Sequence, residues 1–322
     1  MRRRQFLLYS GTVLARAASR LPANKNVKWA VSANLWNSFP RGPITDVLDV
    51  MRDTGFVGIR LTQFPGILKS YDISAAVLEK EMSRRNLQVA TISFNGPAHD
   101  ATQHAKYLAS AKEAMEFLRT FGARHLVIFS PPRPILTVPG GKAVPVPDAQ
   151  FRTMCDGFNK VGELAKTMGF RAGLHNHMDQ MVETPEEVDQ CMKMTDPALF
   201  WFSPDSAHLH LGGSNVPLVM ERHKARLMFA DYKDARWTEP KDDFVQGNGK
   251  VVAKGSRSAR FLSSIYDLGD GEIDFPACHR VLKSIDYKGW ICVDLDSARK
   301  GPRASYERCG EYVVNKLEPI YS

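Results

Sequence analysis

The chain has few cysteines, and no two of them form a Cys-x-x-Cys pair. Its 322 residues contain five: Cys155, Cys191, Cys278, Cys292 and Cys309. An odd number excludes a complete set of internal disulfides, and the missing spacing removes the common thiolate sites for zinc or redox chemistry. We therefore expect mostly buried thiols, with Cys292 inside a strand.

Long hydrophobic runs and concentrated charge of one sign are missing as well. After the N-terminus no segment approaches the roughly 18 uninterrupted apolar residues of a membrane span, so we expect no stable membrane insertion. The formal net charge is +8, but the basic residues are scattered apart from the N-terminus and residues 250–260. A solvated basic surface explains this pattern better than a nucleic-acid site does. Hydrophobic residues make up 43% of the chain and charged residues 24%, which is typical of a folded globular protein.

The first 25 residues resemble a twin-arginine export signal. They contain the run RRRQFLL at positions 2–8, a mildly apolar stretch to about Leu14, and the small-x-small pattern ARA at positions 15–17. The apolar stretch is short, so a disordered basic N-terminus is the alternative. We expect residues 1–25 to direct the protein to the periplasm or outside the cell, and a cytoplasmic protein if they do not.

Eight short β-rich runs follow this segment. Each has four to eight residues rich in Val, Ile, Leu, Phe or Ala, as strands buried on both faces should have. The runs are 29–33, 56–62, 88–94, 125–130, 170–177, 199–204, 226–232 and 289–295.

Helical patterns fill the segments between these runs. They include 44–54, 74–85, 102–121 and 150–168, and Gly55, Gly122 and Gly169 end three of them. Strand and helix in regular alternation predict a parallel sheet. An open doubly wound sheet is the competing topology, but no Gly-x-Gly-x-x-Gly follows the first strand, and eight units favour closure. We predict one (β/α)8 TIM barrel over residues 26–322.

Two long connections interrupt the regular spacing. Residues 130–147 carry six prolines and two adjacent glycines, and residues 236–271 are polar, basic and contain glycine. Both follow strands, and the loops after strands form the face of a barrel where active sites are built. We expect these two loops to form lids or substrate walls.

Polar residues stand at four predicted strand ends. They are His175, Asn176 and His177 after the fifth strand, Asp205 and His208 after the sixth, Asp231, Lys233 and Asp234 after the seventh, and Asp294 and Asp296 after the eighth. Converging aspartates repel one another unless a cation or protons compensate their charge. One divalent metal is the economical solution, and carboxylates with an imidazole suit Mn²⁺, Mg²⁺, Co²⁺ or Fe²⁺, with Zn²⁺ also allowed.

Asp205 is the ligand we predict first, with a strand-end cap as its alternative role. His175 and His177 alternate along a strand and point the same way, so one is a ligand and the other can be a core histidine; we favour His175 as the ligand. Asp231 and Asp294 complete the predicted set, with surface or capping roles as the alternative. Lys233 and Asp234 form either a salt-bridged pair or a catalytic lysine with its neighbour, and the sequence leaves this open.

Several motifs together resemble the sugar phosphate isomerase/epimerase family, the xylose isomerase-like TIM barrels. Within that family they are most similar to the inosose dehydratases and related 3-keto-sugar lyases or hydratases. The motifs are HNHM at 175–178, ETPEE at 183–187, TDP at 195–197, DSAH at 205–208, YKDAR at 232–236, GDGEIDF at 269–275 and YKGW at 287–290. The resemblance extends from about Val27 to the C-terminus.

The resemblance implies one divalent metal held at the ends of the fifth to eighth strands, commonly by Glu, Asp, His and Glu. By position these ligands fall on His175, Asp205, Asp231 and Asp294, and only Asp205 keeps the usual residue type. In the family's epimerases the two glutamates are thought to act as acid and base, so their loss favours a lyase or dehydratase.

We therefore hypothesise a metal-assisted β-elimination from a keto-sugar, keto-inositol or 3-keto-glycoside, or the reverse hydration. Its predicted residues are His177, His208 and Lys233 for catalysis, and Asn176, Arg236 and Asp296 for substrate binding. The alternatives are a sugar isomerase or epimerase, an exported carbohydrate-binding barrel without catalysis, and an apurinic-site endonuclease. The last would need a larger His and Glu set for several zinc ions. We expect a small carbohydrate partner and no nucleic acid, and a homo-oligomer stays open because barrels of this group often pair.

Overall fold

A computed structural model describes residues 20–62, 64–136 and 144–322 of the chain. Most of the predicted export signal, including the proposed cleavage pattern at positions 15–17, lies outside these residues. The described part of that segment packs on the C-terminal end of the chain, where the backbone N–H of Ala23 and the guanidinium of Arg20 both donate to the carboxylate of Glu318. Among the described residues no helix is long and apolar enough to span a bilayer.

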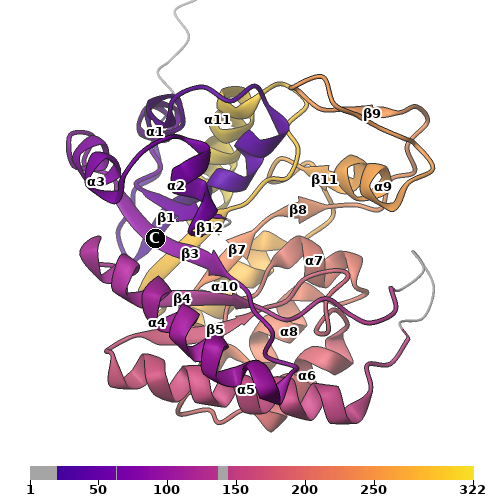
Figure 1. The fold of residues 1–322 in the computed structure, drawn as a ribbon. Helices are drawn as coiled ribbons and strands as arrows, with labels where there is room; N and C mark the ends of the chain where they lie inside the picture. The colour runs from indigo at the N-terminus through magenta and orange to yellow at the C-terminus, as the bar shows by residue number, and fades with distance from the viewer. Residues whose placement is uncertain (1–19, 63, 137–143) are drawn as a thin grey trace, which may run out of the picture.

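Eight parallel strands form one curved sheet in the order β6-β5-β4-β3-β2-β1-β12-β7 (Figure 1). Their bounds are β1 Val27–Ser32, β2 Gly58–Leu61, β3 Gln88–Phe94, β4 His125–Phe129, β5 Arg171–His175, β6 Phe200–Phe202, β7 Ala230–Tyr232 and β12 Gly289–Val293. All eight lie within or beside the predicted runs, and every neighbouring pair is parallel.

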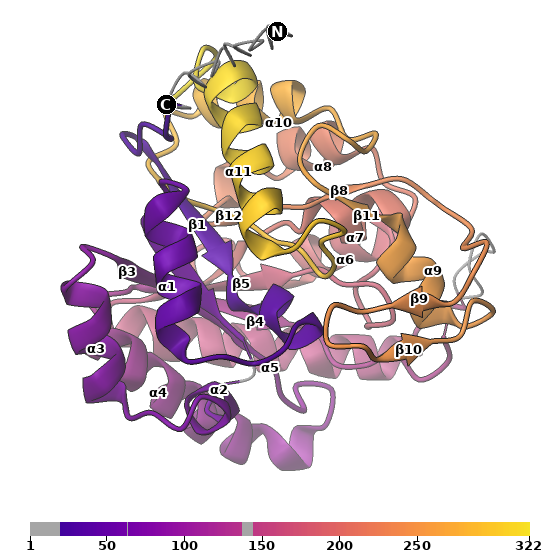
Figure 2. The same ribbon diagram turned by 90° about the horizontal axis from the view of Figure 1, so that it is seen from above.

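The sheet closes between β6 and β7. The backbone N–H of Met228 donates to the carbonyl of Phe202 at 3.0 Å, and that of Asp231 donates to the carbonyl of Pro204 at 2.8 Å. Two parallel bridges, Phe202 with Leu227 and Asp205 with Asp231, accompany these bonds. The sheet is therefore a closed barrel and not the open doubly wound sheet that was the competing topology. Figure 2 shows the helices around the barrel.

Helices cover the outside of the barrel. They are α1 Ile44–Asp53, α2 Gly66–Ser70, α3 Ala75–Ser83, α4 His104–Thr120, α5 Asp148–Thr167, α6 Pro185–Met194, α7 Ser206–Leu211, α8 Val216–Arg222, α9 Arg257–Ser264, α10 Phe275–Ser284 and α11 Pro302–Tyr312, with shorter turns at Ala33–Ser38, Ala101–Gln103, Lys224–Arg226 and Val313–Leu317. Gly55, Gly122 and Gly169 have φ values of 82°, 73° and 77°, the left-handed conformation that ends a helix. Their predicted capping role is confirmed.

The seventh strand begins later than the sequence predicts. Residue Arg226 ends a helical turn, and its guanidinium donates to the carbonyls of Phe200 and Thr195 and to the hydroxyl of Thr195. Leu227 then forms an isolated parallel bridge with Phe202, and regular pairing begins at Ala230, so β7 has only three residues.

The predicted long loop, residues 236–271, has secondary structure of its own. A hairpin of β9 Phe244–Val245 and β10 Val251–Val252 precedes α9, and β11 Ile265–Tyr266 returns antiparallel to β8 Asp234–Ala235. At the hairpin tip Asn248 donates to the carbonyls of Ser38 and Asn37 at 3.1 and 3.2 Å. This insertion therefore reaches across to the loop that follows β1.

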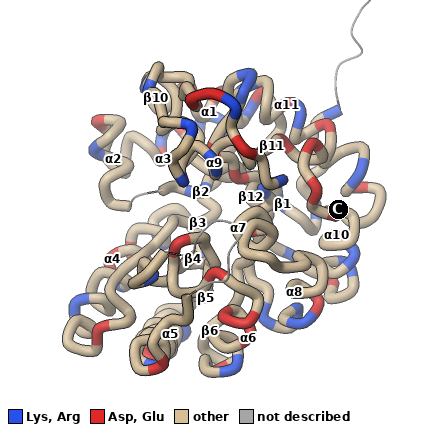
Figure 3. Tube along the Cα trace, turned by 90° about the vertical axis from the view of Figure 1, so that its right-hand side faces the viewer, with Lys and Arg blue, Asp and Glu red and all other residues tan. Residues whose placement is uncertain are grey.

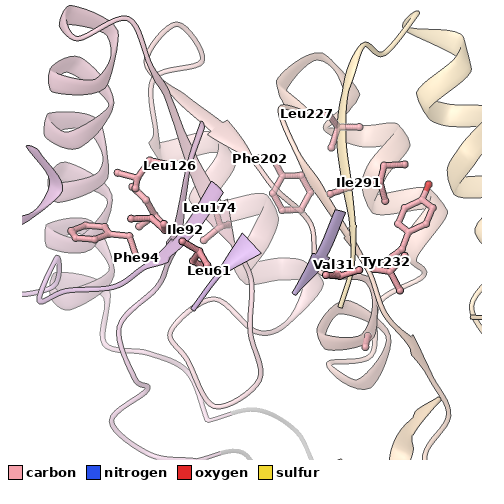
Figure 4. Close-up of a cluster of buried hydrophobic side chains, with 14 of the residues drawn as sticks. Val31, Leu61, Ile92, Phe94, Leu126, Leu174, Phe202, Leu227, Tyr232 and Ile291 are labelled. Atoms are coloured by element: carbon pink, nitrogen blue, oxygen red, sulfur yellow. The ribbon is translucent and has the colours of Figure 1, made fainter. Parts of the chain in front are cut away.

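The strands carry two separate apolar layers because their side chains alternate in direction. The outer layer packs against the helices, and Figure 4 shows part of it, with Leu126, Leu174 and Ile291 among the labelled side chains. The inner layer consists of Ala30, Ala90, Val127, Met228, Phe229, Trp290 and Cys292. It fills the barrel interior, so the polar site can occupy only one end. All five cysteines are free and buried, as expected.

Charged residues are spread over the outer helices. Figure 3 shows Lys and Arg interspersed with Asp and Glu along the trace rather than gathered in one patch. This distribution agrees with the predicted solvated basic surface.

We predict that Gly58→Ala destabilises the barrel. A Cβ at this position would lie 2.3 Å from the indole ring of Trp290, which is itself packed inside the barrel. We expect a loss of about 1–3 kcal/mol in the free energy of unfolding, measured by urea denaturation. Gly66→Ala is the control, since a Cβ there meets no atom within 4 Å. Equal stability of the two variants would contradict the interior packing.

Candidate active site

The interior-facing residues change from apolar to charged at the C-terminal ends of the strands. The charged group consists of Arg60 from β2, His175 from β5, Asp205 after β6, Asp231 and Lys233 at β7, and Asp294 and Asp296 after β12. All except Asp296 are buried, with side-chain exposures of 2% or less. The structure thus brings the four predicted metal ligands together, along with Lys233 and Asp296.

Lys233 lies at the centre of this group. Its Nζ is 3.1 Å from Asp205, 2.6 Å from Asp294 and 2.8 Å from Asp296, measured to one carboxylate oxygen of each. Burial alone would lower the pKa of Lys233, but the charges of Asp205 and Asp294 outweigh it and raise the pKa well above its usual value. The three protons of the ammonium match the three carboxylates, so this lysine is permanently charged.

Arg60 is a second buried cation, and the sequence reading missed it. Its Nη2 is 2.7 Å from Asp294 and 3.3 Å from the hydroxyl of Ser32, and its Nε is 3.4 Å from Asp231. The signal was available, because an arginine inside a strand buried on both faces requires an anionic partner.

His175 lies between two buried carboxylates. Its Nδ1 is 3.1 Å from Asp231 and its Nε2 is 3.6 Å from Asp205. Burial raises the pKa of both aspartates and lowers the pKa of His175. The other oxygen of Asp205 accepts the N–H of His208 at 3.1 Å and caps α7, so the alternative role as a cap is also realised. Nδ1 of His175 and both carboxylate oxygens of Asp231 are buried and have no hydrogen-bond partner among the residues that the structure describes.

The hydrogen bonds of His177 leave one ring nitrogen free as a base. Its Nδ1 lies 2.6 Å from the carbonyl oxygen of Met178 and must donate to it, because a carbonyl only accepts. Burial and the neighbouring Lys233 lower the pKa of His177, which favours the neutral ring. The neutral ring therefore presents an unprotonated Nε2.

Both ring nitrogens of His208 face hydrogen-bond donors. Its Nδ1 accepts the N–H of Met178 at 3.3 Å, and its Nε2 lies 3.3 Å from the ammonium of Lys233, which can only donate. A neutral ring has one acceptor nitrogen, so these contacts do not assign its tautomer. Burial and the neighbouring His177 lower the pKa of His208. The centroids of the two histidine rings are 3.6 Å apart, so the unprotonated Nε2 of His177 belongs to a ring that lies against a second imidazole.

Three other polar residues at the strand ends do not face the site. Asn176 uses its side-chain amide to hold the backbone of Asp205, accepting its N–H at 3.0 Å and donating to its carbonyl at 3.2 Å. Arg236 is exposed, with its guanidinium 4.7 Å from the centre of the Tyr266 ring. Asp234 accepts backbone N–H groups from the end of the insertion, so it is not the salt-bridge partner of Lys233.

Two cavities meet at His177. The smaller has a volume of about 220 Å³ and a mostly polar lining, which includes Arg60, His175, Lys233 and Asp296. The larger has a volume of about 750 Å³ and is lined by His208 and by the insertion, including Trp237 and Phe261. The ring of Phe261 stacks on that of His208 with 5.2 Å between centroids. Residues 236–271 therefore line the larger cavity, and their role as a substrate wall stays a prediction.

The arrangement does not fit the predicted divalent metal. Across the described ranges 20–62, 64–136 and 144–322, no three His, Cys, Asp or Glu side chains are placed so that they could hold an ion. An ion bound by Asp205 and Asp294 would stand close to the ammonium of Lys233. Two unit charges about 4 Å apart repel by roughly 4 kcal/mol at an effective dielectric constant of 20, and a divalent ion doubles this. The ligand roles of His175 and its partners stay predictions, and the two cations weigh against them.

The chain belongs to the xylose isomerase-like TIM barrel family, whose sequence pattern it matches over residues 48–309. This match confirms both the predicted family and the predicted fold. Two relatives are named inosose dehydratase. The one from Clostridium perfringens is 26% identical over 312 residues, which cover 91% of this chain and 98% of the relative. The one from Halalkalibacterium halodurans is 28% identical over 260 residues, which cover 76% and 80%.

Solved structures share the fold at lower identity. The probable 3-DHS dehydratase AsbF from Bacillus anthracis superposes with a TM-score of 0.68 at 12% identity, covering 90% of this chain and 99% of its own. The IOLI protein, solved with a binding zinc atom, superposes with a TM-score of 0.67 at 17% identity, covering 92% and 99%. These likenesses establish the fold, while the chemistry depends on the residues described above.

We predict that Arg60→Leu strongly destabilises the protein. The change leaves Asp231 without its cation and removes one of the two cations of Asp294, both of them buried. Such a loss typically costs about 3–5 kcal/mol, measured by urea denaturation. Arg84→Leu is the control, because its pair with Glu81 lies on the surface and should contribute less than about 1 kcal/mol. A loss no larger than that of the control would contradict the buried network.

We also predict a pH-dependent difference between the wild type and Asp231→Asn. Burial raises the pKa of Asp231, so the folded state loses stability as the pH rises above the ordinary carboxyl range and through the folded pKa. The amide cannot ionise. The unfolding free energy of the wild type, minus that of the variant, should therefore fall between about pH 4 and about pH 7, from the ordinary carboxyl pKa to the folded pKa. A difference that is constant with pH would show that Asp231 ionises normally.

Proposed function

We propose that the protein is a sugar-active enzyme of the dehydratase or lyase type. It removes a proton next to a ketone and eliminates the oxygen on the following carbon, or adds water in reverse. The observation that carries this proposal is the pair His177 and His208: the first presents an unprotonated Nε2, and the second contacts the buried ammonium of Lys233. The inosose dehydratase relatives and the fold shared with a 3-DHS dehydratase support the same reaction class.

The elimination needs one base and one acid, and the two rings supply them. Nε2 of His177 accepts the proton from the carbon next to the ketone, and the electron pair of that C–H bond moves toward the carbonyl oxygen. The C–O bond on the following carbon then breaks, and the leaving oxygen takes its electron pair and a proton from His208, whose Nε2 lies 3.3 Å from the ammonium of Lys233. The positive charges of Lys233 and Arg60, both on the wall of the smaller cavity, stabilise the enolate oxygen. Exchange with water restores both histidines.

The cavities indicate how a substrate would lie. The smaller cavity has a volume on the order of seven water molecules, comparable with one sugar ring, and its lining offers many hydrogen-bond partners. The larger, mostly apolar cavity begins on the other side of His177 and leaves room for a second group. A 3-keto-glycoside would place its ring in the first cavity and its leaving group in the second. We therefore favour it over a free keto-sugar or keto-inositol.

An isomerase or epimerase is the second candidate, and the geometry supports it less. Epimerisation needs acid and base groups on opposite sides of the substrate. Asp294, at one of the family's usual glutamate positions, is held by both Arg60 and Lys233, which keeps its pKa well below the usual range. A carboxylate held in this way is a poor base.

We predict that histidine variants separate the two half-reactions on a panel of 3-keto-glucosides. His177→Gln should lose α-proton exchange and elimination by about 10²–10⁴-fold, since both need the base. His208→Gln should keep exchange and lose elimination, since only the second step needs the acid. Exchange is followed by NMR in D₂O and elimination by product release. His223→Gln is the control, because His223 pairs with Asp189 on the outer surface.

Two outcomes would contradict this proposal. If the wild type exchanges the α-proton of none of the keto-sugars tested, the proposed reaction class is wrong. Tight sugar binding without exchange would support the carbohydrate-binding barrel instead.

A further inference from the structure

The carboxylates at the barrel's centre already have a cation among them. Lys233 places its ammonium within 3.1 Å of Asp205, which follows β6, and within 2.8 Å of Asp294 and Asp296, which follow β12. These strand ends are where the resemblance predicts a divalent ion. The charge compensation that the sequence requires is thus supplied by the chain itself.

Two hydrogen bonds with Ser206 hold the backbone of Lys233, and thereby position its ammonium. The hydroxyl of Ser206 accepts the backbone N–H of Lys233 at 2.8 Å and donates to its carbonyl at 2.8 Å. The side chain is 2% exposed and surrounded by its carboxylate partners. An incoming ion would have to displace the buried ammonium of Lys233 from three ion pairs.

Arg60, unlike Lys233, has an N–H donor that no described residue accepts. The Nη1 of Arg60 is buried and has no hydrogen-bond partner among the residues that the structure describes. Arg60 also lines the smaller cavity, while its Nη2 is held by Asp294 and Ser32. A buried guanidinium N–H beside a polar cavity is suited to a carbonyl or enolate oxygen of a ligand.

We propose that this site works without a divalent ion: Lys233 neutralises the carboxylates in its place, and Arg60 donates to the carbonyl oxygen of the substrate. The first half follows from the ion pairs alone. The second half rests on the proposed function and makes Arg60 a catalytic residue of that reaction. No step of the elimination described above then requires a metal.

The first experiment needs no substrate and therefore tests the first half independently of the proposed function. The full chain, purified without chelator, is analysed for Mn, Fe, Co and Zn and titrated with Mn²⁺ and Zn²⁺ by calorimetry. The zinc-containing IOLI protein serves as the positive control. We expect well below one ion per chain and a melting temperature unchanged by EDTA. One tightly bound ion per chain, removed by EDTA with a loss of melting temperature, overturns the proposal.

A variant tests whether the ammonium is what excludes the ion. Lys233→Met should bind Mn²⁺ on the order of 100-fold more tightly than the wild type, because three carboxylates lose their cation. Lys224→Met, an exposed lysine paired with Glu221, is the matched control and should change nothing. Metal binding no tighter than in the wild type overturns the proposal. Circular dichroism checks the fold, and the wild-type measurement stands by itself if the variant does not fold.

The role of Arg60 is tested by a change that keeps its charge. Arg60→Lys retains a cation beside Asp294 but loses the planar fork, so kcat for α-proton exchange should fall on the order of 100-fold with KM nearly unchanged. Arg84→Lys on the surface is the control. Wild-type kcat in Arg60→Lys would contradict donation by Arg60 and leave the metal measurements to decide the first half.

Discussion

Four carboxylates meet inside one end of the barrel, and the rest of the site depends on how their charge is balanced. The ammonium of Lys233 contacts Asp205, Asp294 and Asp296, and the guanidinium of Arg60 contacts Asp231 and Asp294. Without these two cations the ends of three strands would carry uncompensated buried charge, which costs several kcal/mol for each ion. Burial, together with a smaller effect of Lys233, lowers the pKa of the neighbouring His177 and His208. The network therefore stabilises the fold and lies beside the two histidines of the proposed reaction.

The interior of the barrel is apolar along most of its axis and carries the charged group at one end. Apolar side chains such as Trp290 and Met228 fill the interior below the charged group, so the site is a closed-ended cavity rather than a channel. At β7 the alternation of the strand divides two adjacent residues between tasks: Lys233 faces the carboxylates, and Asp234 holds the end of the insertion through backbone N–H groups. The insertion in turn stacks Phe261 on His208, so one wall of the larger cavity contacts this histidine ring.

The shared fold and the individual site give different kinds of information. Solved structures of the same architecture at 12–17% identity include a dehydratase and a zinc-containing protein, so the scaffold supports more than one chemistry. In this chain two cations, Lys233 and Arg60, lie among the carboxylates at the strand ends. The proposed reaction class therefore rests on His177 and His208 more than on the architecture.

The sequence by itself determined the barrel. Apolar runs of strand length, helical periodicity between them and glycines such as Gly55 and Gly169 are local signals, and they gave the eight strands with small errors at their ends. It also indicated which strand ends converge, because parallel strands place their C-terminal ends together. The exception was β7, where the bonds of Arg226 to a neighbouring strand override the local pattern.

Only the tertiary structure decided what compensates the converging charge. The sequence placed His175, Asp205, Asp231 and Asp294 together and predicted one divalent metal to balance them, because pattern and spacing do not give the distance between side chains on different strands. Arg60 is 171 positions before Asp231 in the chain, and only closure of the barrel brings their side chains to 3.4 Å. The direction of Lys233 and the backbone contacts of His177 and His208 are likewise set by packing. Distances and orientations in the folded chain show that two cations, Lys233 and Arg60, lie among the residues of the predicted metal site.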